Sequence, residues 1–152
     1  MRSKALFPLV GLMAALTAAP AAAQMGSPNT TPGAVVRVIQ IRIKPGRADA
    51  FWADFRQNIK PIYDQEKQQG IIANYTVATK ATLNNENDWS VSVRLTYPNW
   101  AALDGLAAKA GPLMLAHYGS AAKQSEAATA RTENSATVAT FLVREQTVNP
   151  WK

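Results

Sequence analysis

Apolar and polar residues alternate along four segments of the chain, which is the pattern of β-strands with one buried face. The segments span residues 35–44, 71–80, 89–97 and 136–146. The alternation is clearest over 89–97, where every second residue is large and apolar: Trp89, Val91, Val93, Leu95 and Tyr97. Over 35–44, one face carries Val35, Ile39, Ile41 and Ile43, and Arg37 is its exception. The pattern predicts four strands.

Two further segments repeat apolar residues at helical spacing. Residues 47–69 place Phe51, Phe55, Ile59 and Ile62 on one stripe, and Gly70 follows as a candidate C-terminal cap. Pro61 lies inside this helix and is expected to kink or split it, because proline has no amide donor.

The second helix is expected to begin at Trp100, after Asn99 as its N-terminal cap, and to end at Gly111-Pro112. Its inward stripe is Trp100, Leu103, Leu106, Ala107 and Ala110. A short helical turn over 113–118 and an exposed helix over 121–132 are expected to follow.

The elements therefore follow the order strand, helix, strand, strand, helix, strand. This order is typical of the ferredoxin-like βαββαβ pattern, an α+β fold whose antiparallel sheet carries its helices on one face. The other face must then be polar, paired with another subunit, or both.

The first 23 residues have the three parts of a secretory signal peptide. Basic residues at 1–4 precede an uncharged apolar run over 5–18, and small residues at 21–23 form a cleavage site. We therefore expect a cleaved signal peptide over 1–23, a flexible leader over 24–33, and one domain over 34–152. The mature protein is expected to be periplasmic or secreted, with no membrane segment after cleavage.

Composition narrows the possible chemistry. Among the 152 residues there is no cysteine and one histidine, which excludes disulfide scaffolds, thiolate nucleophiles and cysteine-based metal sites. Loss of Arg2 and Lys4 with the signal peptide lowers the formal net charge from +6 to +4. The remaining positive charges are dispersed, so we expect no nucleic-acid partner. The sequence also predicts no metal site and no cofactor.

Two short segments carry a resemblance to a known superfamily. Lys44-Pro45-Gly46-Arg47 followed by Phe51 and Phe55, and Tyr97-Pro98-Asn99-Trp100-Ala101-Ala102-Leu103, resemble the dimeric α/β-barrel superfamily. Its antibiotic-biosynthesis-monooxygenase-like domains are the most similar group, and the chain is most similar to their uncharacterised secreted members. The likeness spans about residues 34–147 and consists of turns and apolar spacing, which identify a fold better than a reaction.

The resemblance implies a homodimer whose two sheets face each other to form a barrel, with a ligand pocket between each sheet and its helices. The polar strand residues would then fill the shared interior or its rim: Gln40, Asn74, Thr76, Ser90, Ser92 and Arg94. We expect the pocket to bind a small apolar or aromatic molecule, to which Arg94, Tyr75, Trp52 and Tyr118 are the candidate ligand-binding residues.

Whether the protein is an enzyme is left open by the sequence. The alternative to a binding protein is a cofactor-independent monooxygenase acting on an aromatic ring, with His117, Trp100 and Asn74 as catalytic residues. A haem-degrading branch of the superfamily uses a helix histidine with a tryptophan and a strand asparagine. In this chain Ile39 stands where that asparagine would fall, which argues against haem binding or degradation.

Overall fold

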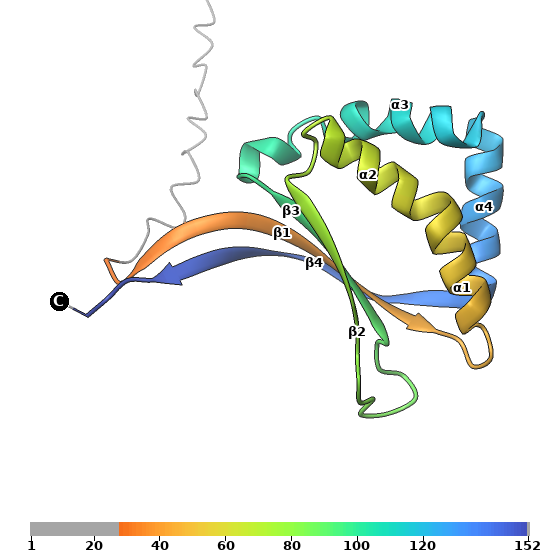
Figure 1. Cartoon of the computed structure of the whole chain (residues 1–152), viewed down its shortest axis with the longest axis horizontal. Coiled ribbons are helices and arrows are strands. Elements are labelled where there is room, and N and C mark those ends of the chain that lie inside the picture. Colours follow the sequence, from red (N-terminus) through yellow and green to blue (C-terminus); the bar gives the residue numbers. More distant parts are fainter. Residues whose placement is uncertain (1–27, 152) are drawn as a thin grey trace, which may run out of the picture.

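Four antiparallel strands form one sheet in the order β2-β3-β1-β4, and all helices lie on one of its faces (Figure 1). The computed structural model describes residues 28–151. The strands are β1 (Thr30–Ile43), β2 (Asn74–Thr79), β3 (Val91–Tyr97) and β4 (Ser135–Val148). This topology confirms the predicted α+β, ferredoxin-like fold. The predicted signal peptide lies outside the described residues, and within these no helix is long and apolar enough to cross a membrane.

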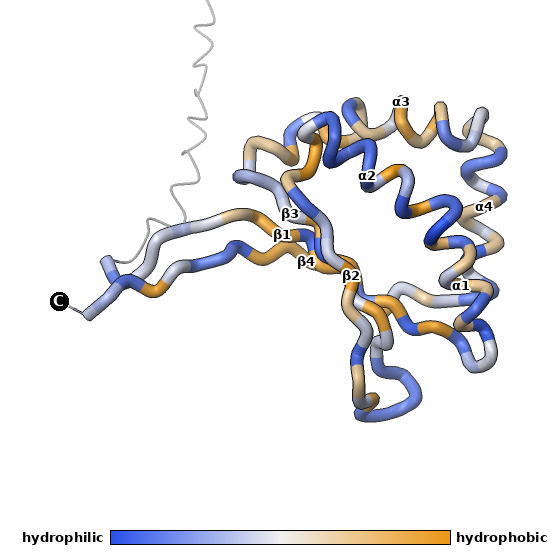
Figure 2. The backbone as a smooth tube through the Cα atoms, in the orientation of Figure 1, coloured by the Kyte–Doolittle hydropathy of each residue, from blue (hydrophilic) through white to orange (hydrophobic). Residues whose placement is uncertain are grey.

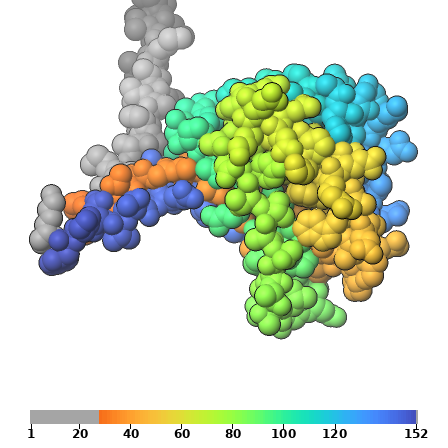
Figure 3. Space-filling view, viewed as in Figure 1, coloured from red at the N-terminus to blue at the C-terminus, as the bar shows by residue number. Residues whose placement is uncertain are grey.

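β1 and β4 extend beyond the rest of the sheet as a two-stranded arm (Figures 1 and 3). Thr30 pairs with Val148 and Pro32 with Gln146, whereas the pairing of β1 with β3 begins only at Val35. β1 therefore starts at Thr30, inside the range expected to be a flexible leader. The backbone hydrogen bonds to β4 order these residues despite their proline and glycine content.

The first helical segment is continuous from residue 48 to residue 68, so Pro61 does not split it. It consists of α1 (Ala48–Asp54), a π-helical turn (Phe55–Ile59) and α2 (Lys60–Gln68). The wider π turn ends at Ile59, two residues before Pro61. Pro61 therefore falls in the first turn of α2, where its missing amide leaves no helical bond unmade. Gly70, at φ 71°, follows the helix end as expected.

The second helical segment departs from the prediction at both ends. Asn99 accepts a hydrogen bond from the amide of Ala102 as expected, but it caps a short 3-10 turn (Trp100–Leu103). α3 (Leu106–Tyr118) begins only after Gly105, whose φ of 64° reverses the chain. The predicted break at Gly111-Pro112 is wrong: α3 runs through Pro112, which is exposed, so that water can reach the carbonyl left without a partner. The predicted exposed helix is α4 (Ala121–Asn134).

The helix-facing side of the sheet holds the core, as the alternation predicted. Val91, Val93, Leu95 and Tyr97 of β3 are at most 4% exposed, and they pack with Phe51 and Phe55. Figure 2 shows apolar and polar residues alternating along α1 and α2. Phe51 of α1 and Ile62 of α2 are buried. Trp100 was predicted to face inward, and this prediction is wrong. The 3-10 turn leaves its side chain outside the core and 43% exposed.

The opposite side of the sheet, which we call the open face, carries none of the helices formed by residues 28–151 (Figure 1). β2 and β3 give it four of the predicted polar residues, Asn74, Thr76, Ser92 and Arg94, together with Thr96. β1 and β4 give it apolar residues in register, since Val36 pairs with Val143 and Val38 pairs with Phe141. The open face is therefore half polar and half apolar.

Candidate functional site

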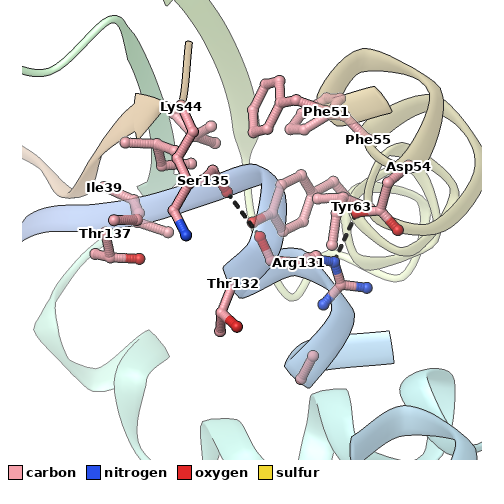
Figure 4. Close-up of a pocket in the computed structure, with 15 residues that line it drawn as sticks. Ile39, Lys44, Phe51, Asp54, Phe55, Tyr63, Arg131, Thr132, Ser135 and Thr137 are labelled. Carbon is pink, nitrogen blue, oxygen red and sulfur yellow. Dashed lines mark hydrogen bonds and ion pairs between the residues drawn. The ribbon is translucent and has the colours of Figure 1, made fainter. Parts of the chain in front are cut away.

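Two cavities lie between the helices and the sheet. The α1 cavity, of about 500 Å³, is bounded by α1, the π turn, α4 and strands β1, β3 and β4 (Figure 4). The α3 cavity, of about 700 Å³, is bounded by α2, α3, α4 and the other ends of β1 and β3. The cavities share five lining residues: Ile39, Ile59, Tyr63, Ala128 and Arg131. They are therefore neighbouring compartments, with Tyr63 and Arg131 between them.

Most of the lining is apolar, as expected for space between an apolar helix stripe and an apolar sheet face. In the α3 cavity these residues include Ile62, Leu95, Leu103, Leu106, Ala110 and Met114. Such a lining, with a few polar groups directed into it, is the common composition of small-molecule sites. The chemistry of the cavities therefore depends on those polar groups.

Arg131 anchors a polar network at the border of the two cavities. Its Nε donates to Oδ2 of Asp54 at 2.7 Å, and its guanidinium also contacts the Tyr118 hydroxyl. Figure 4 shows the guanidinium directed from α4 at the Asp54 carboxylate. The other Asp54 oxygen accepts from Nδ2 of Asn58 at 2.7 Å. These bonds hold α4 over the sheet and leave the charges of Arg131 and Asp54 paired.

The α3 cavity holds a second pair of opposite charges, Arg37 and Glu66. Glu66 is 6% exposed, and the pKa of its carboxyl is raised by burial, an effect that the nearby Arg37 charge opposes. Within residues 28–151 the two side chains form no ion pair and no hydrogen bond. Arg37 instead lies over the Tyr97 ring, 5.8 Å from its centre.

Two tyrosines complete this polar group. Burial raises the pKa of Tyr63 to about 12, and the Glu66 charge acts in the same direction. Burial also raises the pKa of Tyr97. Both phenols therefore remain protonated at neutral pH and can donate a hydrogen bond into the α3 cavity.

The three predicted catalytic residues do not line either cavity. His117 lies on α3, with Nε2 3.3 Å from Oδ1 of Asn58, at the end of the Arg131 network. Trp100 lies in the exposed 3-10 turn, and Asn74 begins β2, where its Oδ1 accepts from Lys67. No hydrogen bond or ring contact joins any two of the three among the described residues. Their catalytic role stays a prediction.

Of the four predicted ligand-binding residues, Tyr118 lines the α3 cavity. Arg94 is exposed on the open face, on the far side of the sheet from both cavities. Tyr75 is on the helix-facing side, where its hydroxyl donates to Asp64 at 2.6 Å. Trp52 packs edge-to-face on Phe51, with ring centres 5.0 Å apart.

Sequence reasoning missed the three charged residues that line the α3 cavity: Arg37, Glu66 and Arg131. Two of these residues, Arg37 and Glu66, could have been found from the apolar pattern of the sequence. Arg37 interrupts the apolar face of β1, and Glu66 continues the helical stripe one turn beyond Ile62. A charged residue on a face that is otherwise buried indicates either a paired group or a site.

Comparison with known proteins finds similarity of fold. HapK from Hahella chejuensis has a TM-score of 0.48 at 12% identity, covering 78% of this chain and 97% of that one. A dimeric ferredoxin-like protein from an uncultured marine organism has a TM-score of 0.46 at 12% identity, covering 80% of this chain and 100% of that one. A dimeric protein of unknown function and ferredoxin-like fold from Bacteroides fragilis has a TM-score of 0.41 at 9% identity, covering 76% and 97%. No family model and no curated protein matches the chain.

Proposed function

We propose that this protein is an exported homodimer that binds a small, largely apolar molecule between its sheet and its helices. The observation that carries the proposal is the α3 cavity. Its volume of about 700 Å³ falls within the range of about 300–1,000 Å³ that is usual for small-molecule sites. Its polar groups converge from β1, α2, β3 and α4, so that they would fix the orientation of a bound molecule.

The binding proposal is tested with a neutral fluorescent probe, N-phenyl-1-naphthylamine, whose emission rises in apolar surroundings. We expect saturable binding in the micromolar range by the chain without residues 1–23. Ala128 lines both cavities from α4, so Ala128→Trp fills their shared wall and should weaken binding at least about tenfold. Ala130→Trp, at an exposed position on the same helix that lines neither cavity, should bind like the unmodified chain. Equal affinities for both variants would contradict the proposal.

The homodimer is supported by the open face. Phe141 is 42% exposed and pairs with the buried Val38, next to the buried Val36. A second copy placed against this face would cover the apolar half and bring the polar half, with Arg94, into a shared interior.

Light scattering tests the dimer independently of the ligand. We expect the mass of a dimer at micromolar concentration, and the mass of a monomer for Phe141→Arg, because the new charge would be buried at the interface. Leu115→Arg, at an exposed apolar position of α3, should remain dimeric. A monomer mass for the unmodified chain would contradict the proposed homodimer, but it would not contradict the proposed ligand site.

A further inference from the structure

The polar end of the α3 cavity has hydrogen-bonding capacity that the protein itself does not use. Glu66 is 6% exposed as a residue, and no donor within residues 28–151 reaches its carboxylate, whose oxygens are open to the space of the cavity. The Arg37 guanidinium, opposite it on β1, has a ring contact with Tyr97 but no acceptor among those residues. Both side chains line the same cavity.

Leaving Arg37 and Glu66 without bonding partners costs free energy unless a bound molecule forms hydrogen bonds with them. A carboxylate in a largely apolar cavity gives up part of its hydration and gains no bond from the protein in return. The fold leaves Arg37 and Glu66 apart, although a salt bridge between them would satisfy both. A group placed between them could accept from the guanidinium and donate to the carboxylate.

The charges determine which ligand groups fit this position. A ligand carboxylate would be repelled by Glu66, and a ligand ammonium would be repelled by Arg37. A hydrocarbon or an ether offers no donor, so Glu66 would stay unpaired. A hydroxyl is neutral and has both a donor and acceptor lone pairs, so one group can satisfy both residues.

We propose that the α3 cavity selects neutral alcohols or phenols, whose hydroxyl donates to Glu66 and accepts from Arg37 while the apolar body packs among Leu95, Leu106 and Met114. This inference rests on the proposed binding function and names its ligand class. The protonated Tyr63 and Tyr97 hydroxyls flank the position and are available to a second polar group on the ligand.

The test uses four probes that share one ring system: 2-naphthol, 2-methoxynaphthalene, naphthalene and 2-naphthoate. Their dissociation constants are measured at pH 7 by displacement of N-phenyl-1-naphthylamine. We expect 2-naphthol to bind about tenfold more tightly than 2-methoxynaphthalene, because its hydroxyl can donate a hydrogen bond to the charged Glu66 and the methoxy group cannot. 2-Naphthoate should bind most weakly of the four.

Variants test whether Glu66 causes the preference for 2-naphthol over 2-methoxynaphthalene. Glu66→Leu should bring 2-naphthol and 2-methoxynaphthalene to equal affinity, and Glu66→Gln, which keeps the shape and one acceptor oxygen, should reduce the preference in part. Glu126→Leu, at an exposed position of α4 outside both cavities, should retain it in full. Equal binding of all four probes by the unmodified chain, or a preference that survives in Glu66→Leu, overturns this inference and leaves the binding function standing. Absence of any displaceable probe overturns both.

Discussion

The two cavities share a wall and differ in how their charges are arranged. At the border of the α1 cavity, Arg131 and Asp54 are bonded to each other, and Asn58 and Tyr118 complete their hydrogen bonding. In the α3 cavity, Arg37 and Glu66 face the same space without forming a bond. Each pair has one residue on the first helical segment and one on an element packed against it.

This difference separates a structural role from a recognition role. A charge pair whose bonds are all made within the fold stabilises the arrangement of its helices and has little left for a ligand. A pair that is unbonded, in which Glu66 is buried and Arg37 is half-buried, reduces the stability of the fold, and a molecule bound between its members can recover that loss. The prediction is that removing the first pair weakens the fold, whereas removing the second strengthens it.

Asp54→Ala is expected to have the largest effect on stability. It leaves the Arg131 guanidinium, which is 27% exposed, without its counter-ion, and it removes the acceptor of Asn58. We expect the free energy of unfolding to fall by about 2 kcal/mol. Urea unfolding monitored by circular dichroism measures this change. Asp49→Ala, at an exposed position of the same helix, should change it by less than about 1 kcal/mol. Equal losses in the two variants would show that the Arg131 network does not hold α4.

How far the sequence predicts this molecule depends on whether a feature is local. The strands and the core face followed from alternation, because Val91, Val93, Leu95 and Tyr97 repeat at the period of a strand. The π turn before Pro61 and the passage of α3 through Pro112 did not, because both depend on how the helices pack on the sheet. The arm formed by β1 and β4 was also missed, since its order comes from pairing between the two ends of the domain.

The site was harder to predict for the same reason. Arg131 lies in a helix of alanine and small polar residues, and it is held at the cavities by bonds to Asp54, 77 positions earlier, and to Tyr118. Arg94 looked like a ligand-binding residue because it lies on a polar strand face, and that face turned out to be the one without helices. Arg37 and Glu66 were visible as breaks in apolar patterns. A charged residue on an otherwise apolar face is therefore as informative a sequence signal for a site as a lone histidine.

Glu66→Leu is expected to stabilise the ligand-free protein by about 1 kcal/mol at neutral pH, because a leucine fills the position without an unpaired carboxylate. The pH dependence identifies the cause. Burial raises the pKa of Glu66 in the folded state above its usual 4.5, so folding favours the protonated form. The penalty for burying the charge is therefore present in full above the folded pKa, and it declines as the pH falls through that value toward 4.5.

The difference in unfolding free energy between Glu66→Leu and the unmodified chain should accordingly be largest at neutral pH and shrink on acidification. Other carboxylates titrate equally in both proteins and cancel in the difference. Urea unfolding of the two proteins side by side across this pH range measures it. A difference that stays constant with pH would mean that leucine stabilises by packing alone, and that the Glu66 carboxylate is not held charged at a cost to the fold. The contrast between the bonded and the unbonded charge pair would then lose its energetic basis.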